Sequence, residues 1–272
     1  QKAVLPPQVV IEKFFSDYFI FFKPRDIVSG DFYWIYGGDK KMIIAVADCT
    51  GHGVPGAFMS LLGVSFLNEI ISRHIEYKND EINPAQMLSA LRNKVITALH
   101  QSGQEGEAND GMDISLVLID KEKKKLVFSG AMNSIYVVRK KNNRNFPEFD
   151  ENTLVNLIVD DQYKIKDIQA DLLELKADRM PISIHQHADR NFTNHKFDLL
   201  KGDKVYLFTD GFMDQFGKRE NKRFTRLRFK SLLGMMADFS MERQHEILEN
   251  VLNRWKWKYD QVDDILVAGL EF

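Results

Sequence analysis

The pattern of apolar and polar positions predicts short buried strands in two groups, with long helices between them. The run 42–47 contains β-branched residues and is bounded by turn-forming residues, which is typical of a buried strand rather than a helix. Further runs of the same kind predict strands at 114–119, 126–129, 135–138, 205–208 and 265–267. A chain with this alternation belongs to a mixed α and β class.

Two long helices and a later third are predicted from apolar residues at helical spacing. The segment 54–75 has apolar residues on more than one helical face, which suits a helix between a sheet and another layer. Asn83 and Pro84 are typical of an N-cap and a first-turn proline, and an apolar stripe follows them to Leu99. The segment 240–259 has its apolar residues on one side, so they are expected to belong to the core.

Three segments are harder to place. Residues 1–22 are expected to be a linker and an amphipathic lead-in helix before a domain that covers 23–272. Residues 140–178 are polar, and we interpret them as an insertion with a hairpin or extra strands, either a surface elaboration or a substrate- or partner-binding flap. The segment 218–230 has seven Lys or Arg residues in thirteen positions. A solvated helix face is favoured there, and attraction of an acidic, phosphorylated partner is the alternative.

Composition narrows the class of protein. The chain has 272 residues, 44% of them hydrophobic, which is enough for one large core. The formal net charge of −2 provides no basic field for nucleic acid. The single cysteine, Cys49, excludes an internal disulfide and fits a reducing, cytoplasmic location. No uninterrupted apolar run approaches the roughly 18 residues of a membrane span, so we expect no membrane contact by this domain.

Isolated aspartates stand at the ends of several predicted strands: Asp31, Asp48, Asp210 and Asp263, with Asp264 next to the last. Singly, each is typical of a turn or a helix cap. Together, carboxylates without a cysteine or histidine cluster suit a hard divalent cation such as Mg²⁺ or Mn²⁺. Carboxylates that converge on one point would repel each other unless a cation lay among them.

Six blocks of sequence carry a resemblance to a known family. They are SGDFYW, ADCTGHGVPGAFMS, DGMDISLVLID, FSGAMNSIYVV, LFTDGFMDQFG and VDDILVAGL. In content and order they resemble the SpoIIE-like bacterial serine/threonine phosphatases, a branch of the metal-dependent (type 2C, PPM) protein phosphatase superfamily. The resemblance implies an α+β fold, an α-β-β-α sandwich of two antiparallel sheets flanked by helices, with the metals at one edge.

The resemblance also implies roles for the aspartates. Asp48 would bridge two divalent cations, Mn²⁺ or Mg²⁺, and the backbone carbonyl of Cys49 would be a further ligand. Asp31 would reach the centre directly or through water, and Asp210 and Asp263 would complete one metal's ligands. Asp264 would be a neighbouring ligand or support the others. A pair of such ions can activate a bridging water for in-line attack on phosphorus.

Other candidate residues near these motifs are less specific. His52 would protonate the leaving oxygen, or else cap its turn or contact a metal-bound water. Arg25, with Lys23 beside it, is a candidate for gripping the substrate phosphate. Cys49 has no adjacent histidine base, so its thiol is expected to be a small buried group rather than a nucleophile.

The predicted function is hydrolysis of phosphoserine or phosphothreonine on a regulatory protein. In relatives that protein is often an anti-sigma-factor antagonist, and the region before the first metal aspartate often connects to an N-terminal sensor. One alternative is a pseudophosphatase that binds a partner without turnover. Another is a hydrolase of small phosphoesters, which would need an enclosed pocket. A homodimer is left open, and a purely structural role would make the aspartates coincidental.

Overall fold

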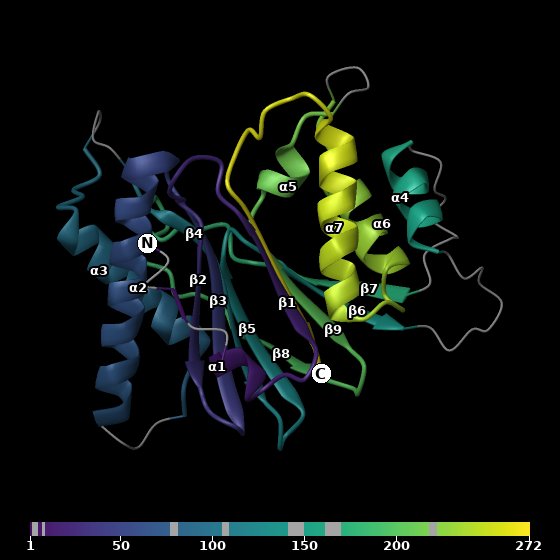
Figure 1. The fold of residues 1–272 in the computed structure, drawn as a ribbon. Helices are drawn as coiled ribbons and strands as arrows, with labels where there is room; N and C mark the ends of the chain where they lie inside the picture. The colour runs from purple at the N-terminus through teal and green to yellow at the C-terminus, as the bar shows by residue number, and fades with distance from the viewer. Residues whose placement is uncertain are drawn as a thin grey trace.

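Two antiparallel sheets packed face to face form the centre of the molecule, and helices cover both outer faces (Figure 1). The structure, a computed structural model, describes residues 1, 5–6, 9–76, 81–104, 109–140, 150–160, 170–217 and 222–272. One sheet has the strand order β1-β10-β9-β6-β7 and the other β2-β3-β4-β5-β8. The predicted α-β-β-α sandwich is confirmed.

The strands are β1 (Tyr18–Lys23), β2 (Phe32–Gly37), β3 (Lys41–Cys49), β4 (Met112–Asp120), β5 (Lys125–Ala131), β6 (Ile135–Lys140), β7 (Ala170–Leu175), β8 (His195–Asp198), β9 (Lys204–Phe208) and β10 (Ile265–Glu271). The helices are α1 (Val9–Glu12), α2 (Gly53–Glu76), α3 (Pro84–Ala98), α4 (Glu151–Val159), α5 (Gly211–Asp214), α6 (Arg226–Met235) and α7 (Met241–Lys256).

The apolar character of β3 follows from its place in the sandwich. Ile44 and Val46 point between the sheets, where they pack with residues of β9 and β10. Ile43 and Ala45 point the other way, toward α2 and α3. Both faces of the strand are therefore buried, and a continuous apolar run replaces the alternation of a half-exposed strand.

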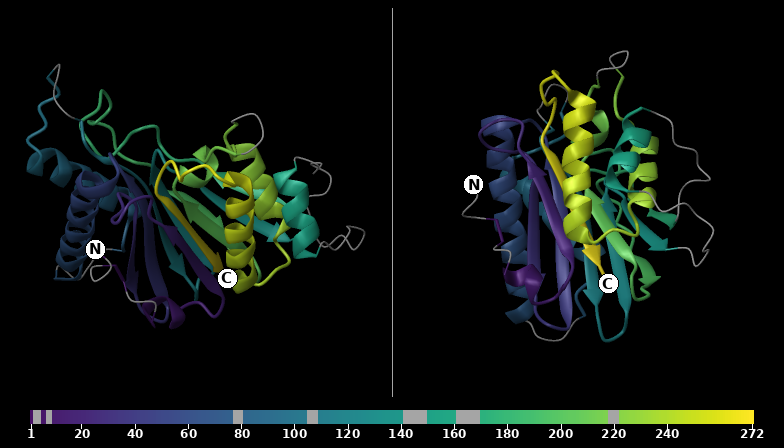
Figure 2. Two further views of the ribbon diagram at one scale, coloured as in Figure 1. Left: turned by 45° about the horizontal axis from the view of Figure 1, so that its top comes forward. Right: turned by 45° about the vertical axis from the view of Figure 1, so that its right-hand side comes forward.

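Helices α2 and α3 lie on one outer face and α4, α6 and α7 on the other, as the turned views of Figure 2 also show. Asn83 caps α3 as predicted, because its side chain accepts a hydrogen bond from the Gln86 N–H at 3.2 Å. By length and composition alone, the segment Gly53–Ile75 of α2 is apolar enough to cross a membrane. Here the helix packs against β2, β3 and α3, as a core helix does.

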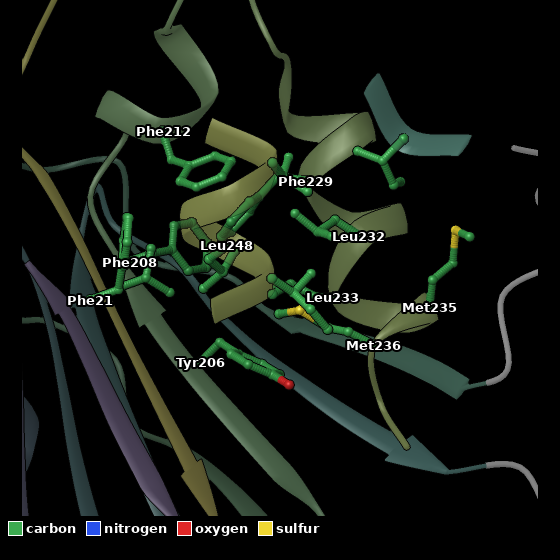
Figure 3. Packing of buried hydrophobic residues seen from close by; sticks show 14 of the residues in the cluster. Phe21, Tyr206, Phe208, Phe212, Phe229, Leu232, Leu233, Met235, Met236 and Leu248 are labelled. Carbon is green, nitrogen blue, oxygen red and sulfur yellow. The ribbon is translucent and has the colours of Figure 1, made fainter. Parts of the chain in front are cut away.

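An aromatic cluster joins the second helical layer to its sheet (Figure 3). Phe212 of α5 contacts Phe21 of β1 with ring centroids 6.3 Å apart, and Phe229 of α6 at 5.3 Å. Phe229 also contacts Phe208 of β9 at 5.3 Å. These contacts hold the short α5 helix against the end of β9, and the two residues between β9 and α5 are Thr209 and Asp210.

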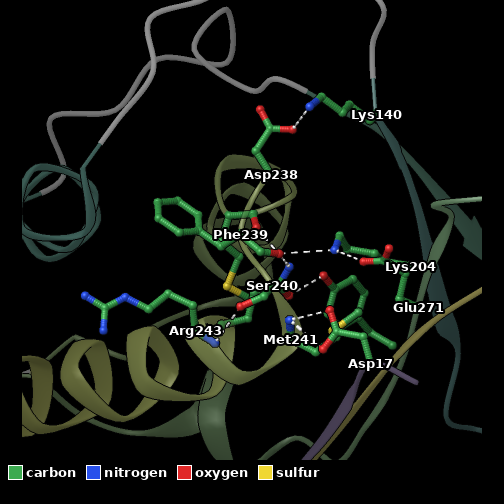
Figure 4. A network of polar contacts seen from close by, with 12 residues as sticks. Asp17, Lys140, Lys204, Asp238, Phe239, Ser240, Met241, Arg243 and Glu271 are labelled. Atoms are coloured by element: carbon green, nitrogen blue, oxygen red, sulfur yellow. Dashed lines mark hydrogen bonds and ion pairs between the residues drawn. The ribbon is translucent and has the colours of Figure 1, made fainter. Parts of the chain in front are cut away.

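A polar network fixes the opposite end of the same layer (Figure 4). The Asp17 carboxylate accepts hydrogen bonds from the Met241 N–H at the start of α7, at 3.0 and 3.1 Å. The buried Lys204 ammonium pairs with Glu271 and donates to the Phe239 carbonyl oxygen. This network ties the N-terminal end of α7 to β9 and β10.

The lead-in helix expected over residues 1–22 is largely wrong. The helix α1 covers only Val9–Glu12, and Tyr18–Lys23 is a strand that pairs with β10 along its whole length. Phe19 and Phe21 pack under α7, while Ile20 and Phe22 face the other sheet. Because this strand has apolar residues on both faces, its sequence pattern does not distinguish it from a helix. Since the strand belongs to the sheet, the folded sandwich begins before residue 23.

Residues 140–178 contain one strand and one helix in their described part. β7 pairs with β6, in line with the expected extra strands, whereas α4 was not expected. Its signals are the Asp150 N-cap, which accepts from the Thr153 N–H at 2.9 Å, and buried Leu154 and Ile158 one turn apart. Residues 141–149 and 161–169 lie outside the described residues, and the interpretation as an insertion stays a prediction.

The basic segment 218–230 is only partly a solvated face. Residues 218–221 lie outside the described part of the chain. Beyond them, Arg228 is buried, lies over the Trp255 ring at 4.4 Å and donates to the Phe224 carbonyl oxygen. Lys230 pairs with Glu174 at 2.9 Å. Cation–π contact and ion pairing bring these two side chains into the packing of α6.

Candidate active site

Five aspartates from strands of both sheets meet at one edge of the sandwich. In antiparallel sheets, the end of one strand lies beside the start of its neighbour. Asp48 near the end of β3 is therefore paired directly with Asp113 near the start of β4, and Asp31 precedes β2 beside them. Asp210 follows β9, and Asp263 comes just before β10 in the other sheet. The fold thus brings Asp31, Asp48, Asp210 and Asp263 to one edge, and their role as metal ligands stays a prediction.

A cleft of about 450 Å³ opens at this edge. Its described lining residues are Asp48, Cys49, Thr50, Gly51, His52, Asn109, Gly111, Met112, Asp113, Pro181, Ser183, Ile184, His185 and Asp263. One wall therefore carries carboxylates. A further part of the lining comes from Pro181, Ser183, Ile184 and His185, a segment that pairs with Met112 next to Asp113.

Asp31 is the most buried of the five, with 2% of its surface exposed. Its Oδ2 accepts a hydrogen bond from the Thr209 hydroxyl at 2.6 Å. The same hydroxyl oxygen accepts from the Leu266 N–H at 3.0 Å, so β9 and β10 together fix its direction. Burial raises the pKa of Asp31 well above its usual range, the Asp48 charge adds to this, and the Thr209 hydrogen bond opposes it.

Asp48 and Asp113 face each other across β3 and β4, and both are hard to ionise. Burial, followed by the charges of Asp210 and Asp263, raises the pKa of Asp48 to about 8. Burial and then the Asp210 charge raise the pKa of Asp113 to about 6. Without a cation, the group therefore retains protons near neutral pH.

Asp210 and Asp263 complete the carboxylate group from the second sheet. The Asp210 side chain reaches solvent and shares a hydrogen bond with Asp48. Desolvation by the surrounding protein raises its pKa, and the charges of Asp214 and Asp263 add to the effect. Desolvation also raises the pKa of Asp263. All five pKa values are thus shifted in the direction that a bound cation would reverse.

Asp264 supports the site through the loop before Asp31, which is one of the two roles expected for it, and its role as a ligand stays a prediction. It is 3% exposed, and its two carboxylate oxygens accept hydrogen bonds from the backbone N–H groups of Arg25 and Gly30, both at 2.7 Å. These bonds hold in place the loop that leads into Asp31. In addition to burial, the Asp264 charge raises the pKa values of Asp31, Asp48 and Asp263, so its carboxylate lies near the other aspartates.

The glycines of the turn after Asp48 allow three backbone segments to approach closely. A Cβ on Gly30 would lie 2.6 Å from the Gly51 carbonyl oxygen, and one on Gly56 would lie 2.1 Å from the same atom. The start of α2 can therefore lie directly beside the Asp31 loop. Burial raises the pKa of the Cys49 thiol, which fits the small buried group that was expected.

The basic candidates are placed unequally. His52 lines the cleft, and its Nδ1 lies 3.1 Å from Asp26 Oδ2. Arg25 instead donates to the Val262 carbonyl oxygen at 3.1 Å and is not among the described lining residues. Lys23 pairs with Glu249 at 2.9 Å. Neither of the two expected phosphate-binding side chains points into the cleft.

The donor chemistry of this edge fits a hard divalent cation, since oxygen ligands of high charge are what Mg²⁺ and Mn²⁺ prefer. The positions of the side chains fit a metal ion less well than their chemistry does. Among the residues that the structure describes, no three His, Cys, Asp or Glu side chains are grouped so as to hold one metal ion. Small rotations of the side chains would be needed to close around an ion.

Three contributors to the site were missed in the sequence. Asp113 lies within the block DGMDISLVLID, but its pairing with Asp48 depends on the register of β3 and β4. Thr209 precedes Asp210, and its contact with Asp31 joins residues 178 positions apart. The third is the wall 181–185, which only the fold brings to the cleft. The only local indication of a role for Thr209 was its position next to Asp210 in the sequence.

The family model for stage II sporulation protein E (SpoIIE) matches residues 38–175 and 168–272. The chain belongs to the SpoIIE family. This membership agrees with the site, because the matched regions include four of the five aspartates and both sheets. No curated protein sequence matches the chain significantly.

Solved structures show the same fold as this SpoIIE-family domain. The SiaA-PP2C domain of Pseudomonas aeruginosa matches with a TM-score of 0.76 and 28% identity, covering 100% of this chain and 92% of that one. The PP2C domain of SpoIIE from Bacillus subtilis, solved with a fragment of its regulatory domain, gives 0.62 and 15%, covering 94% and 63%. RsbX in complex with magnesium gives 0.53 and 15%, covering 94% of each chain. The fold is therefore that of PP2C-type phosphatases.

Proposed function

We propose that this domain is a metal-dependent protein serine/threonine phosphatase that hydrolyses phosphoserine or phosphothreonine on a regulatory protein. The observation that carries the proposal is the grouping of five carboxylates with raised pKa values at one edge of the sandwich, where Asp48, Asp113 and Asp263 line the cleft. Such an arrangement costs folding free energy and is retained where function needs it. Membership of the SpoIIE family supports the same reaction.

Asp48, Asp210 and Asp263 would hold two divalent cations, Mn²⁺ or Mg²⁺, with Asp31 and Asp113 beside them. RsbX, which has this fold, was solved in complex with magnesium, and this supports the choice of ion. Bound ions would supply a water of lowered pKa and neutralise charge on the phosphoryl group. Carrying a pair of such ions requires the carboxyl groups to lose their protons, Asp48 above all. The backbone carbonyl of Cys49, at the cleft wall, would serve as an added ligand.

The chain's own groups would orient the reaction. Thr209 holds Asp31 in one direction, and Asp264 holds the loop before it. His52 is paired through Nδ1 with Asp26, which leaves Nε2 as the atom that would give a proton to the leaving serine or threonine oxygen. The half-exposed His52 side chain places this step at the mouth of the cleft, within reach of a side chain on another protein.

The regulatory setting is part of the proposal. We infer a phosphorylated partner of the anti-sigma-factor-antagonist type, an N-terminal sensor in the full-length protein and a cytoplasmic location. The structure of Bacillus subtilis SpoIIE that includes a fragment of its regulatory domain supports such an arrangement. A homodimer is compatible with this proposal and is not required by it.

A pseudophosphatase is the second candidate, and one observation favours it. The described carboxylates are not grouped around a single point that would hold an ion. If this arrangement persists in solution, the domain would bind its partner through the cleft without turnover.

Phosphate release decides between the two. We would measure release from a phosphoserine peptide and from p-nitrophenyl phosphate, with Mn²⁺ or EDTA, for wild type, Asp210→Asn and Asp238→Asn. Asp238 pairs with Lys140 at 2.7 Å and is not among the described residues that line the cleft, so its variant is the matched control. The phosphatase predicts Mn²⁺-dependent turnover that falls at least about 100-fold in Asp210→Asn alone. Peptide binding without turnover would establish the pseudophosphatase, and turnover of the small ester alone would favour a small-phosphoester hydrolase.

A further inference from the structure

The cleft needs hydrogen-bond donors as well as carboxylates, because a phosphoryl group carries negative charge into it. Arg25, the expected donor, is bonded to the Val262 carbonyl oxygen and is not among the described lining residues, although its charge acts on Asp263. The lining hydroxyls of Thr50 and Ser183 donate to backbone carbonyl oxygens. The remaining donors of the described lining are the Asn109 amide and the longer imidazole side chains of His52 and His185. His52 is already paired with Asp26. His185 is therefore the candidate donor to a phosphoryl oxygen.

The wall that carries His185 is fixed to the strand that carries Asp113. The Ile182 N–H donates to the Met112 carbonyl oxygen at 2.9 Å. A buried glutamine adds a second link, since Gln101 donates to the Asp110 carbonyl oxygen at 2.6 Å and accepts from the Ile184 N–H at 2.9 Å. The wall and the carboxylates consequently form one rigid frame around the cleft.

The His185 ring has a defined orientation. Its Nδ1 accepts a hydrogen bond from the His187 N–H at 3.3 Å. In a neutral imidazole one nitrogen accepts and the other carries the proton, so Nδ1 as acceptor puts the hydrogen on Nε2. The half-buried ring thus presents an N–H donor, and the His187 ring packs edge-on against it at 5.4 Å.

We propose that His185 binds the substrate phosphoryl group, donating from Nε2–H to a phosphoryl oxygen in the cleft that Asp48, Asp113 and Asp263 also line. This deepens the proposed phosphatase function and rests on it. His185 would take the place in the cleft that Arg25 was expected to fill. Its contact would be made in the bound substrate as well as during reaction, so it should affect binding more than turnover.

Two variants of His185 are decisive, because each places an amide nitrogen near one of the two ring nitrogens. The amide nitrogen of His185→Gln comes near the position of Nε2, whereas that of His185→Asn comes near Nδ1. His187→Ala keeps the backbone N–H that orients His185 and is the matched control. We would titrate inorganic phosphate and a phosphoserine peptide into each protein with Mn²⁺ by calorimetry, and measure KM and kcat on the peptide.

We expect His185→Ala and His185→Asn to weaken phosphate binding and raise KM about tenfold, equivalent to ~1.4 kcal/mol, with kcat changed less than about threefold. His185→Gln and His187→Ala should stay within a fewfold of wild type. As a readout independent of turnover, the ¹⁵Nε2 signal of His185 should shift when phosphate is added, while that of the remote His195 stays in place.

The outcomes separate the two proposals. If wild type turns over and His185→Ala binds phosphate as tightly as wild type, the role of His185 is refuted and the phosphatase stands. If wild type binds phosphate through His185 but shows no turnover, the phosphatase fails and the binding role stands. If wild type binds neither phosphate nor the phosphopeptide in the presence of Mn²⁺, the role of His185 is refuted.

Discussion

Replacing Asp48 with asparagine should stabilise the metal-free domain even though it removes a central candidate ligand. In the folded protein the pKa of Asp48 is raised from 3.8 to about 8 by burial and by the charges of Asp210 and Asp263. The folded state therefore binds this proton more tightly than the unfolded chain does. On this account the contribution of Asp48 to the stability of the metal-free domain is largest below about pH 4 and is lost as the pH rises toward 8.

The size of the effect follows from that pKa difference. At about 1.4 kcal/mol per pKa unit, complete ionisation would cost at most ~6 kcal/mol. Neighbouring carboxyl groups share the proton, so the loss assigned to Asp48 alone is smaller, roughly 2 kcal/mol at pH 8. An asparagine carries no charge and can donate to Asp210. For a chain of this size, ~2 kcal/mol corresponds to a rise in Tm of roughly 4–8 °C.

Thermal unfolding in EDTA at pH 5 and pH 8 checks this prediction. The Asp48→Asn variant should unfold several degrees higher than wild type at pH 8. Its advantage should be clearly smaller at pH 5, where Asp48 is protonated in the folded protein and only the unfolded chain has lost the proton. Addition of Mn²⁺ at 100 times its Kd should stabilise wild type by ~2.7 kcal/mol, and so raise its Tm, and leave the variant unchanged. A lower Tm for the variant at pH 8, or an equal gain at both pH values, would refute the reasoning.

Further substitutions test single contacts. Thr209→Val removes the hydrogen bond to Asp31, so it should lower the free energy of unfolding by about 1–3 kcal/mol and weaken Mn²⁺ binding. Thr209→Ser keeps a hydroxyl at this position and should behave like wild type in both respects. Calorimetry measures both quantities. Gly56→Ala should cost at least ~1–3 kcal/mol in denaturant unfolding because its Cβ would overlap a carbonyl oxygen, while Gly38→Ala, in open space, should be near neutral. Asp264→Ala should destabilise the metal-free protein by at least ~2 kcal/mol, since it leaves two backbone N–H groups without their acceptor; unchanged unfolding would contradict its role in holding the loop.

The positions of the aspartates along the chain were enough to predict most of the site. Each of Asp31, Asp48, Asp210 and Asp263 stands at the end of an apolar run, and strand ends in antiparallel sheets meet at shared edges. The chemistry of a carboxylate set then indicates the class of ion. The edge of the sheet and the class of ion can therefore be predicted from local sequence and sheet geometry.

Long-range contacts account for what the sequence missed. Asp264 stands beside Asp263 and was expected either to bind metal or to support the ligands, but the sequence does not show that its oxygens accept from N–H groups of a loop more than 230 positions earlier. Tyr18–Lys23 looked helical because a strand between two apolar layers has no polar face. His185 had no local motif, and the bridge between Ile182 and Met112 and the hydrogen bonds of Gln101 bring it to the cleft. The sequence pattern of a single strand or helix does not predict such long-range contacts.

Calorimetric titration of Mn²⁺ into the metal-free domain tests the central claim most directly. Because Asp48 and its neighbours hold protons near neutral pH, cation binding at pH 7 should release protons, seen as a heat that depends on the ionisation enthalpy of the buffer. The account predicts saturable binding with proton release in wild type, and strongly weakened binding in Asp210→Asn. Absence of binding in wild type, or identical binding in the variant, would contradict a metal centre at this edge of the sandwich.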